Sequence, residues 1–318
     1  MAPADHGGGI DAARARWGGA RGDWIDLSTG INPLAYPLPA LPAEAWTALP
    51  DRGAEAALVA AARRFWKVPE DAAVLAAPGT SALIARLPGL RSPGRVAIPG
   101  PTYNEHGRAF RKAGWTVTEA VDDHTVTARV IVHPNNPDGR LWSAPETPGL
   151  VVIDESFADT CPEASLIAEA ARPGRIVLKG LGKFWGLAGL RLGFAMGDPA
   201  LIARLADLLG PWPVSGPALA IGSAALSDDA WADAMRARLE EEAARLDALL
   251  GRAGARVLGG TSLFRLAEVP EAHHWQEALA RRRIWTRVFP YSRHWLRLGL
   301  PGSELAWGRL AQALETIG

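Results

Sequence analysis

The sequence contains one cysteine, Cys161, among its 318 residues. A single thiol forms neither an internal disulfide nor a cysteine-based metal cluster, and we expect no metal site. We interpret the thiol as an inert side chain, with a nucleophile as the less favoured alternative.

The sequence also lacks an excess of positive or negative charge, and it lacks long apolar runs. Lys+Arg and Asp+Glu are 34 each, so the formal net charge is zero and no overall field favours nucleic acid or an anionic membrane surface. No apolar run approaches membrane-spanning length, and the stretch 1–6 lacks the basic and apolar regions of a signal peptide. We therefore expect a soluble, cytoplasmic protein whose partners include no nucleic acid and no membrane.

Lysine is scarce, because arginine carries most of the basic charge. Any chemistry that requires a lysine amine therefore has few candidates. The four lysines are Lys67, Lys112, Lys179 and Lys183.

Short apolar runs alternate with turns and helical pieces from about residue 94 onward. Several runs are apolar throughout, without in-and-out alternation, which is typical of a largely parallel sheet covered on both faces. The sequence therefore predicts an α/β fold. The strands predicted for this part are 95–98, 115–121, 129–133, 150–154, 175–178 and 192–196.

A long amphipathic helix with many Arg and Glu pairs is predicted over 229–250, where it would connect two domains. After it, strands with antiparallel spacing alternate with helices, which favours a smaller α+β domain. We expect an N-terminal arm over 1–50, a large domain over 51–235 and a small domain over 236–318. Further predicted elements are helices 53–66, 271–282 and 304–317 and strands 256–258, 263–266, 284–288 and 295–298.

The segment Pro78-Gly79-Thr80-Ser81 precedes a helical stretch. A glycine turn before a helix N-terminus presents free N–H groups to an anion, and Ser81 adds a hydroxyl. The alternative is an ordinary cap on a structural helix.

Two polar segments each follow a predicted strand. Asn136 lies in the turn His133-Pro134-Asn135-Asn136-Pro137-Asp138-Gly139, and Asp154 ends the apolar run 150–154. The carboxyl ends of parallel strands are where open α/β sheets bind ligands, and a buried carboxylate there must be paired with a cation. The alternatives are an ordinary turn for Asn136 and a helix cap for Asp154.

Lys183 lies in the glycine-rich loop Gly180-Leu181-Gly182-Lys183, and Arg191 begins the next predicted strand. A lysine amine becomes nucleophilic when it is desolvated or lies near other cations, and the apolar neighbours of Lys183 disfavour the alternative of a solvated surface lysine. An arginine at the position of Arg191 suits a phosphate.

In this order, the four segments resemble fold-type I pyridoxal-phosphate (PLP) enzymes, and specifically the class I/II aminotransferase superfamily. The resemblance covers nearly the whole chain and implies a large domain with a mostly parallel sheet and a smaller α+β domain. It implies that Lys183 holds pyridoxal 5′-phosphate as a Schiff base and that Asp154 pairs with the pyridine nitrogen. Either Tyr103 or His106 would stack on the ring. The cofactor residues that it implies are Gly79, Thr80, Ser81, Tyr103, His106, Asn136, Asp154, Lys183 and Arg191.

The N-terminal segments His6-Gly7-Gly8-Gly9 and Ser28-Thr29-Gly30-Ile31-Asn32-Pro33 resemble those of the threonine-phosphate decarboxylases of cobalamin biosynthesis. Phe157 stands where most superfamily members have Tyr. The decarboxylase group resembles this chain in having Phe at that position. The resemblance implies a site for a phosphate and a carboxylate, since arginine forks suit both groups. The substrate residues that it implies are His6, Asn32, Arg287 and Arg297.

Two positions depart from the pattern of these relatives. Gly180 stands where relatives often have a Ser or Thr that contacts the cofactor phosphate. Leu49 lies where relatives commonly have a Tyr that reaches the phosphate of the neighbouring subunit. Ser215 or an arginine would compensate for these two contacts.

The resemblance implies PLP-dependent decarboxylation of L-threonine O-3-phosphate to (R)-1-amino-2-propanol O-2-phosphate, by a homodimer with shared active sites. The closest alternative is an aminotransferase of the histidinol-phosphate type. A third is a non-catalytic binding protein with the PLP-enzyme fold, which the departures at Gly180 and Leu49 motivate. The residues do not assign phosphate to one arginine and carboxylate to the other.

Overall fold

The computed structural model describes residues 6–147 and 149–317. Contacts within the chain define two compact units. The large unit comprises residues 35–136 and 140–233, and the small unit comprises residues 6–34, 137–139 and 234–317. The boundary falls after Asp233, inside the long helix α8 (Asp229–Arg252), which confirms the helix predicted over 229–250.

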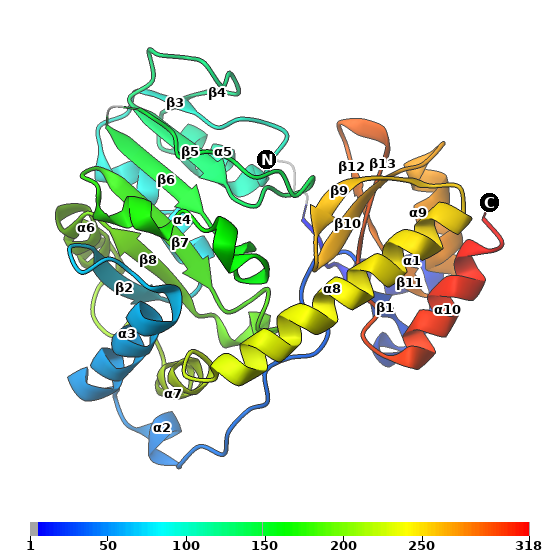
Figure 1. The fold of residues 1–318 in the computed structure, drawn as a ribbon, viewed down its shortest axis with the longest axis horizontal. Coiled ribbons are helices and arrows are strands. Elements are labelled where there is room, and N and C mark those ends of the chain that lie inside the picture. Colours follow the sequence, from blue (N-terminus) through cyan, green and yellow to red (C-terminus); the bar gives the residue numbers. More distant parts are fainter. Residues whose placement is uncertain (1–5, 148, 318) are drawn as a thin grey trace. The chain divides into compact units, whose positions relative to one another are not determined.

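A seven-stranded sheet with the order β2-β8-β7-β6-β5-β3-β4 forms the centre of the large unit (Figure 1). Each pair from β7 to β4 is parallel, whereas β8 runs antiparallel to both of its neighbours. The expected mostly parallel sheet is thereby confirmed. Its strands are β2 (Ala73–Ala77), β3 (Arg95–Ala97), β4 (Thr116–Thr118), β5 (Ala128–Val132), β6 (Leu150–Asp154), β7 (Arg175–Gly180) and β8 (Gly193–Gly197).

Helices pack against this sheet, and β5, β6 and β8 are buried along their whole length. This burial explains why their sequences are apolar without alternation. The helix predicted over 53–66 is confirmed as α3, and its N-cap Asp51 accepts a hydrogen bond from Ala54 N at 3.0 Å. The helices are α2 (Glu44–Thr47), α3 (Arg52–Trp66), α4 (Thr80–Ile84), α5 (Asn104–Lys112), α6 (Pro199–Leu209) and α7 (Gly216–Ala225).

The small unit contains a four-stranded antiparallel sheet with the order β12-β13-β10-β9 and a separate parallel pair, β1-β11. The predicted α+β character is confirmed. The elements are α1 (Ile10–Trp17), β1 (Ile25–Asp26), β9 (Arg256–Thr261), β10 (Phe264–Glu268), α9 (Ala272–Arg281), β11 (Ile284–Trp285), β12 (Arg287–Phe289), β13 (Ser292–Gly299) and α10 (Glu304–Leu314).

Two strand predictions require correction. The single strand predicted over 284–288 is two strands, because β11 pairs with β1 whereas β12 pairs with β13. The strand β2 was not predicted, although it pairs with β8 along its whole length. An Ala-rich run such as Ala73–Ala77 has little strand propensity, so only its sheet partner makes it a strand.

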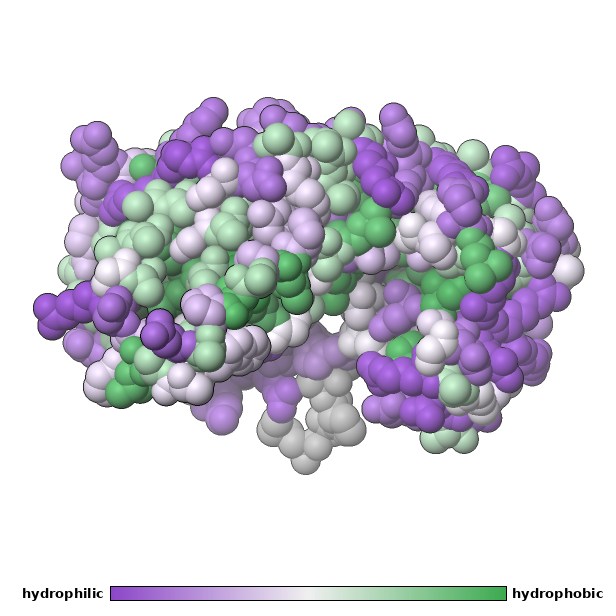
Figure 2. Space-filling model, turned by 90° about the horizontal axis from the view of Figure 1, so that it is seen from below, coloured by the Kyte–Doolittle hydropathy of each residue, from purple (hydrophilic) through white to green (hydrophobic). Residues whose placement is uncertain are grey.

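The surface mixes hydrophilic and hydrophobic residues, as Figure 2 shows for one face. Within the described residues, no helix combines the length and the apolar character needed to cross a membrane.

Candidate active site

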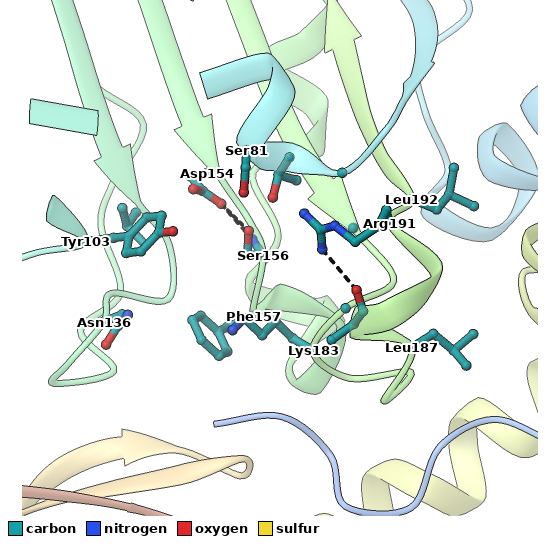
Figure 3. Close-up of a pocket in the computed structure, with 16 residues that line it drawn as sticks. Ser81, Tyr103, Asn136, Asp154, Ser156, Phe157, Lys183, Leu187, Arg191 and Leu192 are labelled. Atoms are coloured by element: carbon teal, nitrogen blue, oxygen red, sulfur yellow. Dashed lines mark hydrogen bonds between the residues drawn. The ribbon is translucent and has the colours of Figure 1, made fainter. Parts of the chain in front are cut away.

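Polar side chains gather where the central parallel strands of the large unit end. Val132 of β5 is in register with Asp154 of β6, which is in register with Leu178 of β7. The loops that follow β5 and β7 carry Asn136 and Lys183, so these two residues and Asp154 line one pocket (Figure 3). Every predicted cofactor residue except His106 lines this pocket.

Asp154 is buried at the end of β6, and its carboxylate accepts several hydrogen bonds. Oδ1 accepts from Ser156 N at 3.0 Å and from the Ser156 hydroxyl, and Oδ2 lies 2.7 Å from His106 Nε2. Burial by itself would raise the pKa of this carboxyl, but His106 and Ser156 together hold the pKa below its ordinary value. The carboxylate is thus kept ionised where a cationic ring nitrogen would bind.

Ser156 was not among the predicted site residues, although it lines the pocket and bonds to Asp154. The signal was present in the sequence. An Asp followed two residues later by Ser at a strand end is typical of a turn in which the carboxylate accepts the i+2 N–H.

His106 occupies a different place from the one proposed in the sequence analysis. Its ring is fully buried on α5, bonded to Asp154, and lies outside the pocket lining, which corrects its candidacy as the group that stacks on the cofactor ring. Tyr103, the other candidate, does line the pocket. Burial, followed by the nearby Asp154 and Glu105 charges, raises the pKa of Tyr103 to about 12, so this phenol stays protonated.

Lys179 and Lys183 have separate surroundings. Lys179 is buried, and its Nζ lies 2.6 Å from Glu155 Oε2 and 3.7 Å from Asp159 Oδ1. Burial opposes the charged form of Lys179, but the two carboxylates raise its pKa above the ordinary value. Lys183 lies in the pocket lining, with Nζ 5.4 Å from the centre of the Phe157 ring. Lys179 is thus committed to an ion pair, and Lys183 is the lysine that faces the pocket.

Ser81 and Arg191 lie in the pocket lining (Figure 3), together with Gly79 and Thr80, which directly precede Ser81. Gly79 has φ +84°, and a Cβ there would lie 2.6 Å from Arg191 Nη2. Arg191 itself has a left-handed backbone, with φ 53°, and its Nη1 donates to Ala188 O at 2.9 Å. A non-glycine residue in this conformation is unfavourable and often marks a functional position. Two hydroxyls and a guanidinium in the lining of one pocket fit the phosphate of PLP.

The two departures from the family pattern have structural contexts. A Cβ on Gly180 would lie 3.2 Å from Thr80 Cγ2, so the side chain of Thr80 occupies the space beside Gly180. Leu49 is exposed. Ser215 caps α7 by accepting from Ala218 N at 3.4 Å and is not part of the pocket lining, so it does not replace the contact missing at Gly180.

The four predicted substrate residues all belong to the small unit. Arg287 of β12 is directly opposite Arg297 of β13, and like charges in this arrangement repel each other. Burial and then the charge of Arg287 lower the pKa of Arg297 to about 10. Arg287 Nη1 donates to His6 O at 2.8 Å, and the buried Asn32 accepts from Leu34 N at 3.0 Å through its side chain. Two cations held against their mutual repulsion favour an anionic ligand.

The fold and the pocket are those of a PLP-dependent transferase, and the family model "Aminotransferase class I and II" matches residues 23–314. The chain belongs to this family.

Two of its relatives are more specific. It is 44% identical to a threonine-phosphate decarboxylase of Sinorhizobium sp, over 99% of each chain. It is 40% identical to the threonine-phosphate decarboxylase of Pseudomonas aeruginosa, over 98% of this chain and 97% of the relative.

Among solved structures, histidinol-phosphate aminotransferase from Sinorhizobium meliloti in complex with pyridoxal-5′-phosphate matches with a TM-score of 0.81. The two sequences are 16% identical, and the match covers 98% of this chain and 95% of that chain. At this identity, the likeness supports the fold alone.

Proposed function

We propose that this protein is a PLP-dependent carboxy-lyase that converts L-threonine O-3-phosphate to (R)-1-amino-2-propanol O-2-phosphate for cobalamin biosynthesis. The observation that carries the proposal is the similarity, over 98–99% of the chain, to two relatives named threonine-phosphate decarboxylase. The facing pair Arg287 and Arg297 supports it, because the substrate has both a phosphate and a carboxylate.

The cofactor is pyridoxal 5′-phosphate, which, when bound, withdraws the electrons of the broken bond into its ring. In the proposed arrangement, Asp154 stays ionised and holds a proton on the ring nitrogen, and Asn136 donates to the ring oxygen. Tyr103 stacks on the ring. Gly79, Thr80, Ser81 and Arg191 hold the phosphate, which their shared place in the pocket lining supports.

Lys183 has two roles in the proposed reaction. It would hold the cofactor until the substrate amine displaces it. Its side chain would then deliver the proton that Cα requires. Loss of carbon dioxide leaves an electron pair on Cα, and one proton delivered there forms the new C–H bond. The return of Lys183 to the cofactor would then release the product amine. Lys183 Nζ lies 5.4 Å from the centre of the Phe157 ring, so Phe157 supports the position of the amine in the pocket.

We propose that His6, Asn32, Arg287 and Arg297 bind the substrate anions. A bidentate guanidinium suits either a carboxylate or a phosphate, and the placement of Arg287 opposite Arg297 supports the binding of two anionic groups.

The test is incubation of the purified holoenzyme with L-threonine O-3-phosphate. We expect release of carbon dioxide and formation of one equivalent of the aminopropanol phosphate, detected by mass spectrometry. The rival activity, that of an aminotransferase of the histidinol-phosphate type, breaks the Cα–H bond instead. Glutamate formation from 2-oxoglutarate without carbon dioxide release would overturn the decarboxylase proposal.

The third candidate, a non-catalytic protein with this fold, is tested by spectroscopy. PLP bound to a lysine absorbs visible light, so the purified protein incubated with PLP should show a visible absorption band. A protein that fails to develop the band would support the non-catalytic alternative.

We also propose that the protein is a homodimer, with the large unit as its PLP-binding domain and the small unit as its α+β domain. Large apolar side chains exposed on the large unit support the dimer, among them Trp46, Leu49 and Trp212. Light scattering should give twice the chain mass for the wild type and the chain mass for Leu49→Arg/Trp212→Arg. The control Leu305→Arg changes an exposed leucine of the small unit and should stay dimeric. The expected cytoplasmic location remains a prediction.

A further inference from the structure

Three glycines follow His6, and each has a physical reason to be glycine. A Cβ on Gly7 would lie 2.4 Å from Ser28 O, closer than any real contact. Gly8 and Gly9 have φ angles of +90° and +83°, which side chains other than glycine rarely adopt. Within the glycine segment (Gly7–Gly9), Gly7 therefore lies directly against the backbone of Ser28, and Gly8 and Gly9 turn the chain.

Ser28 is buried two residues after the end of β1 and is bonded to both Gly8 and Asp26. Its Oγ accepts from Gly8 N at 2.6 Å and donates to Asp26 Oδ1 at 2.6 Å, and Ser28 N donates to the same carboxylate oxygen at 2.9 Å. A hydroxyl has one proton, and Asp26 accepts it, so the Oγ lone pairs remain directed at Gly8.

The carbonyl of Ser28 is bonded to the buried arginine. Arg297 Nη2 donates to Ser28 O at 2.6 Å. The same carbonyl oxygen makes the close approach that restricts position 7 to glycine. A single residue thus contacts the glycine segment through its side chain and Arg297 through its backbone.

Trp285 is bonded to the carbonyl group of Gly8. The parallel pairing of β1 and β11 sets Asp26 opposite Trp285, and Trp285 Nε1 donates to Gly8 O at 2.8 Å. Next to it, Arg287 Nη1 donates to His6 O at 2.8 Å. The N–H and C=O of Gly8 are therefore both fixed, and the adjoining His6 is bonded to one of the two facing arginines.

We infer that Ser28, oriented by Asp26, is a positioning residue that together with Trp285 sets His6 beside Arg287 and Arg297 and thereby determines affinity for the phosphorylated substrate. This inference rests on the proposed function for the part that concerns substrate. Ser28 touches no reacting atom, so its loss changes substrate binding rather than the chemical step. Gly8 N–H loses its acceptor when the hydroxyl is removed, and the glycine segment detaches.

The test uses the holoenzyme with Ser28→Ala and Trp285→Phe, which remove the two bonds of Gly8 from opposite sides. The matched control is Ser303→Ala, which also removes one serine acceptor in the small unit, since Ala306 N donates to Ser303 Oγ at 3.2 Å. The first measurement is hydrogen–deuterium exchange of the peptide that contains residues 6–10. We expect exchange to be at least tenfold faster in both variants and unchanged in the control.

The second measurement separates KM from kcat for L-threonine O-3-phosphate. We expect KM to rise about tenfold in each variant, the loss typical of one hydrogen bond, with kcat within about twofold of the wild type. Unchanged exchange in both variants, or a fall in kcat as large as the fall in kcat/KM, would overturn the inference.

The two measurements test the inference independently of each other. Exchange requires no substrate, so it tests the attachment of the glycine segment even if the wild type does not decarboxylate threonine phosphate. Calorimetric titration of the holoenzyme with inorganic phosphate then replaces the kinetic measurement. Affinity about tenfold weaker in Ser28→Ala than in Ser303→Ala supports the inference, and equal affinity refutes it.

Discussion

His106 Nε2 lies 2.7 Å from Asp154 Oδ2, and both side chains are almost fully buried. The second ring nitrogen, Nδ1, has no hydrogen-bond partner among the described residues. The proton of a neutral ring is therefore on Nε2, where it is donated to the carboxylate. The histidine that was a candidate for stacking on the cofactor is instead the donor that keeps Asp154 ionised.

Removal of this donor should lower activity and shift its pH dependence. With His106→Phe, we expect kcat to fall about tenfold to a hundredfold, because a buried carboxylate loses a hydrogen bond to its charged form. The donors hold the pKa of Asp154 low, so their loss raises the pKa and protonates Asp154 at a higher pH. The acid limb of the pH–kcat profile should therefore move to higher pH. His106→Gln, which retains an N–H donor, should recover part of both effects, and identical profiles for both variants would contradict this account.

Substitution of Lys183 should abolish activity but not stability, whereas substitution of Lys179 should lower stability. Lys183→Ala should fold with a melting temperature near that of the wild type but lose the visible band of bound PLP and all turnover. Lys179→Met should leave Glu155 and Asp159 buried without their cation, which costs about 3–5 kcal/mol of unfolding free energy. Denaturant unfolding and absorption spectra of both variants distinguish the roles, and a lost band in folded Lys179→Met would contradict them.

Gly180 and Thr80 should behave as a coupled pair. A serine at position 180 would place its Cβ 3.2 Å from Thr80 Cγ2, so Gly180→Ser alone should raise the PLP dissociation constant about fivefold by overpacking. Thr80→Ser removes the opposing methyl and keeps the hydroxyl. The double variant should therefore bind PLP within about twofold of Thr80→Ser alone in a spectral titration. Additive losses would show that the two positions are independent.

Arg297 should lower the stability of the folded protein when no substrate is bound. Its pKa is lowered to about 10, so below that pH the folded protein holds a cation that burial and Arg287 disfavour, and this cost is relieved only as the pH rises through about 10. We expect Arg297→Met to raise KM at least a hundredfold without lowering the melting temperature at neutral pH. L-Threonine O-3-phosphate should raise the melting temperature of the wild type and not that of the variant. A large destabilisation of the ligand-free variant would assign Arg297 a structural role instead.

The sequence by itself determined most strands of the two larger sheets and the helices α3, α8, α9 and α10, whereas α5, α6 and α7 were not predicted. It also selected Asp154, Asn136, Lys183 and Arg191 as residues at strand ends or in the loops between strands. This succeeded because burial on both faces leaves an unbroken apolar run, and because the carboxyl ends of parallel strands converge whatever the details of packing.

Only the tertiary structure decided which groups these residues contact. The spacing of Tyr103 and His106 does not reveal that one lines the pocket while the other lies behind Asp154. The division of the run 284–288 between two sheets, and the closeness of Ser28 to Gly7, arise from pairing between segments far apart in the chain. Periodicity reports that a residue is buried, whereas its partner is set by long-range pairing and packing, which the local sequence does not encode.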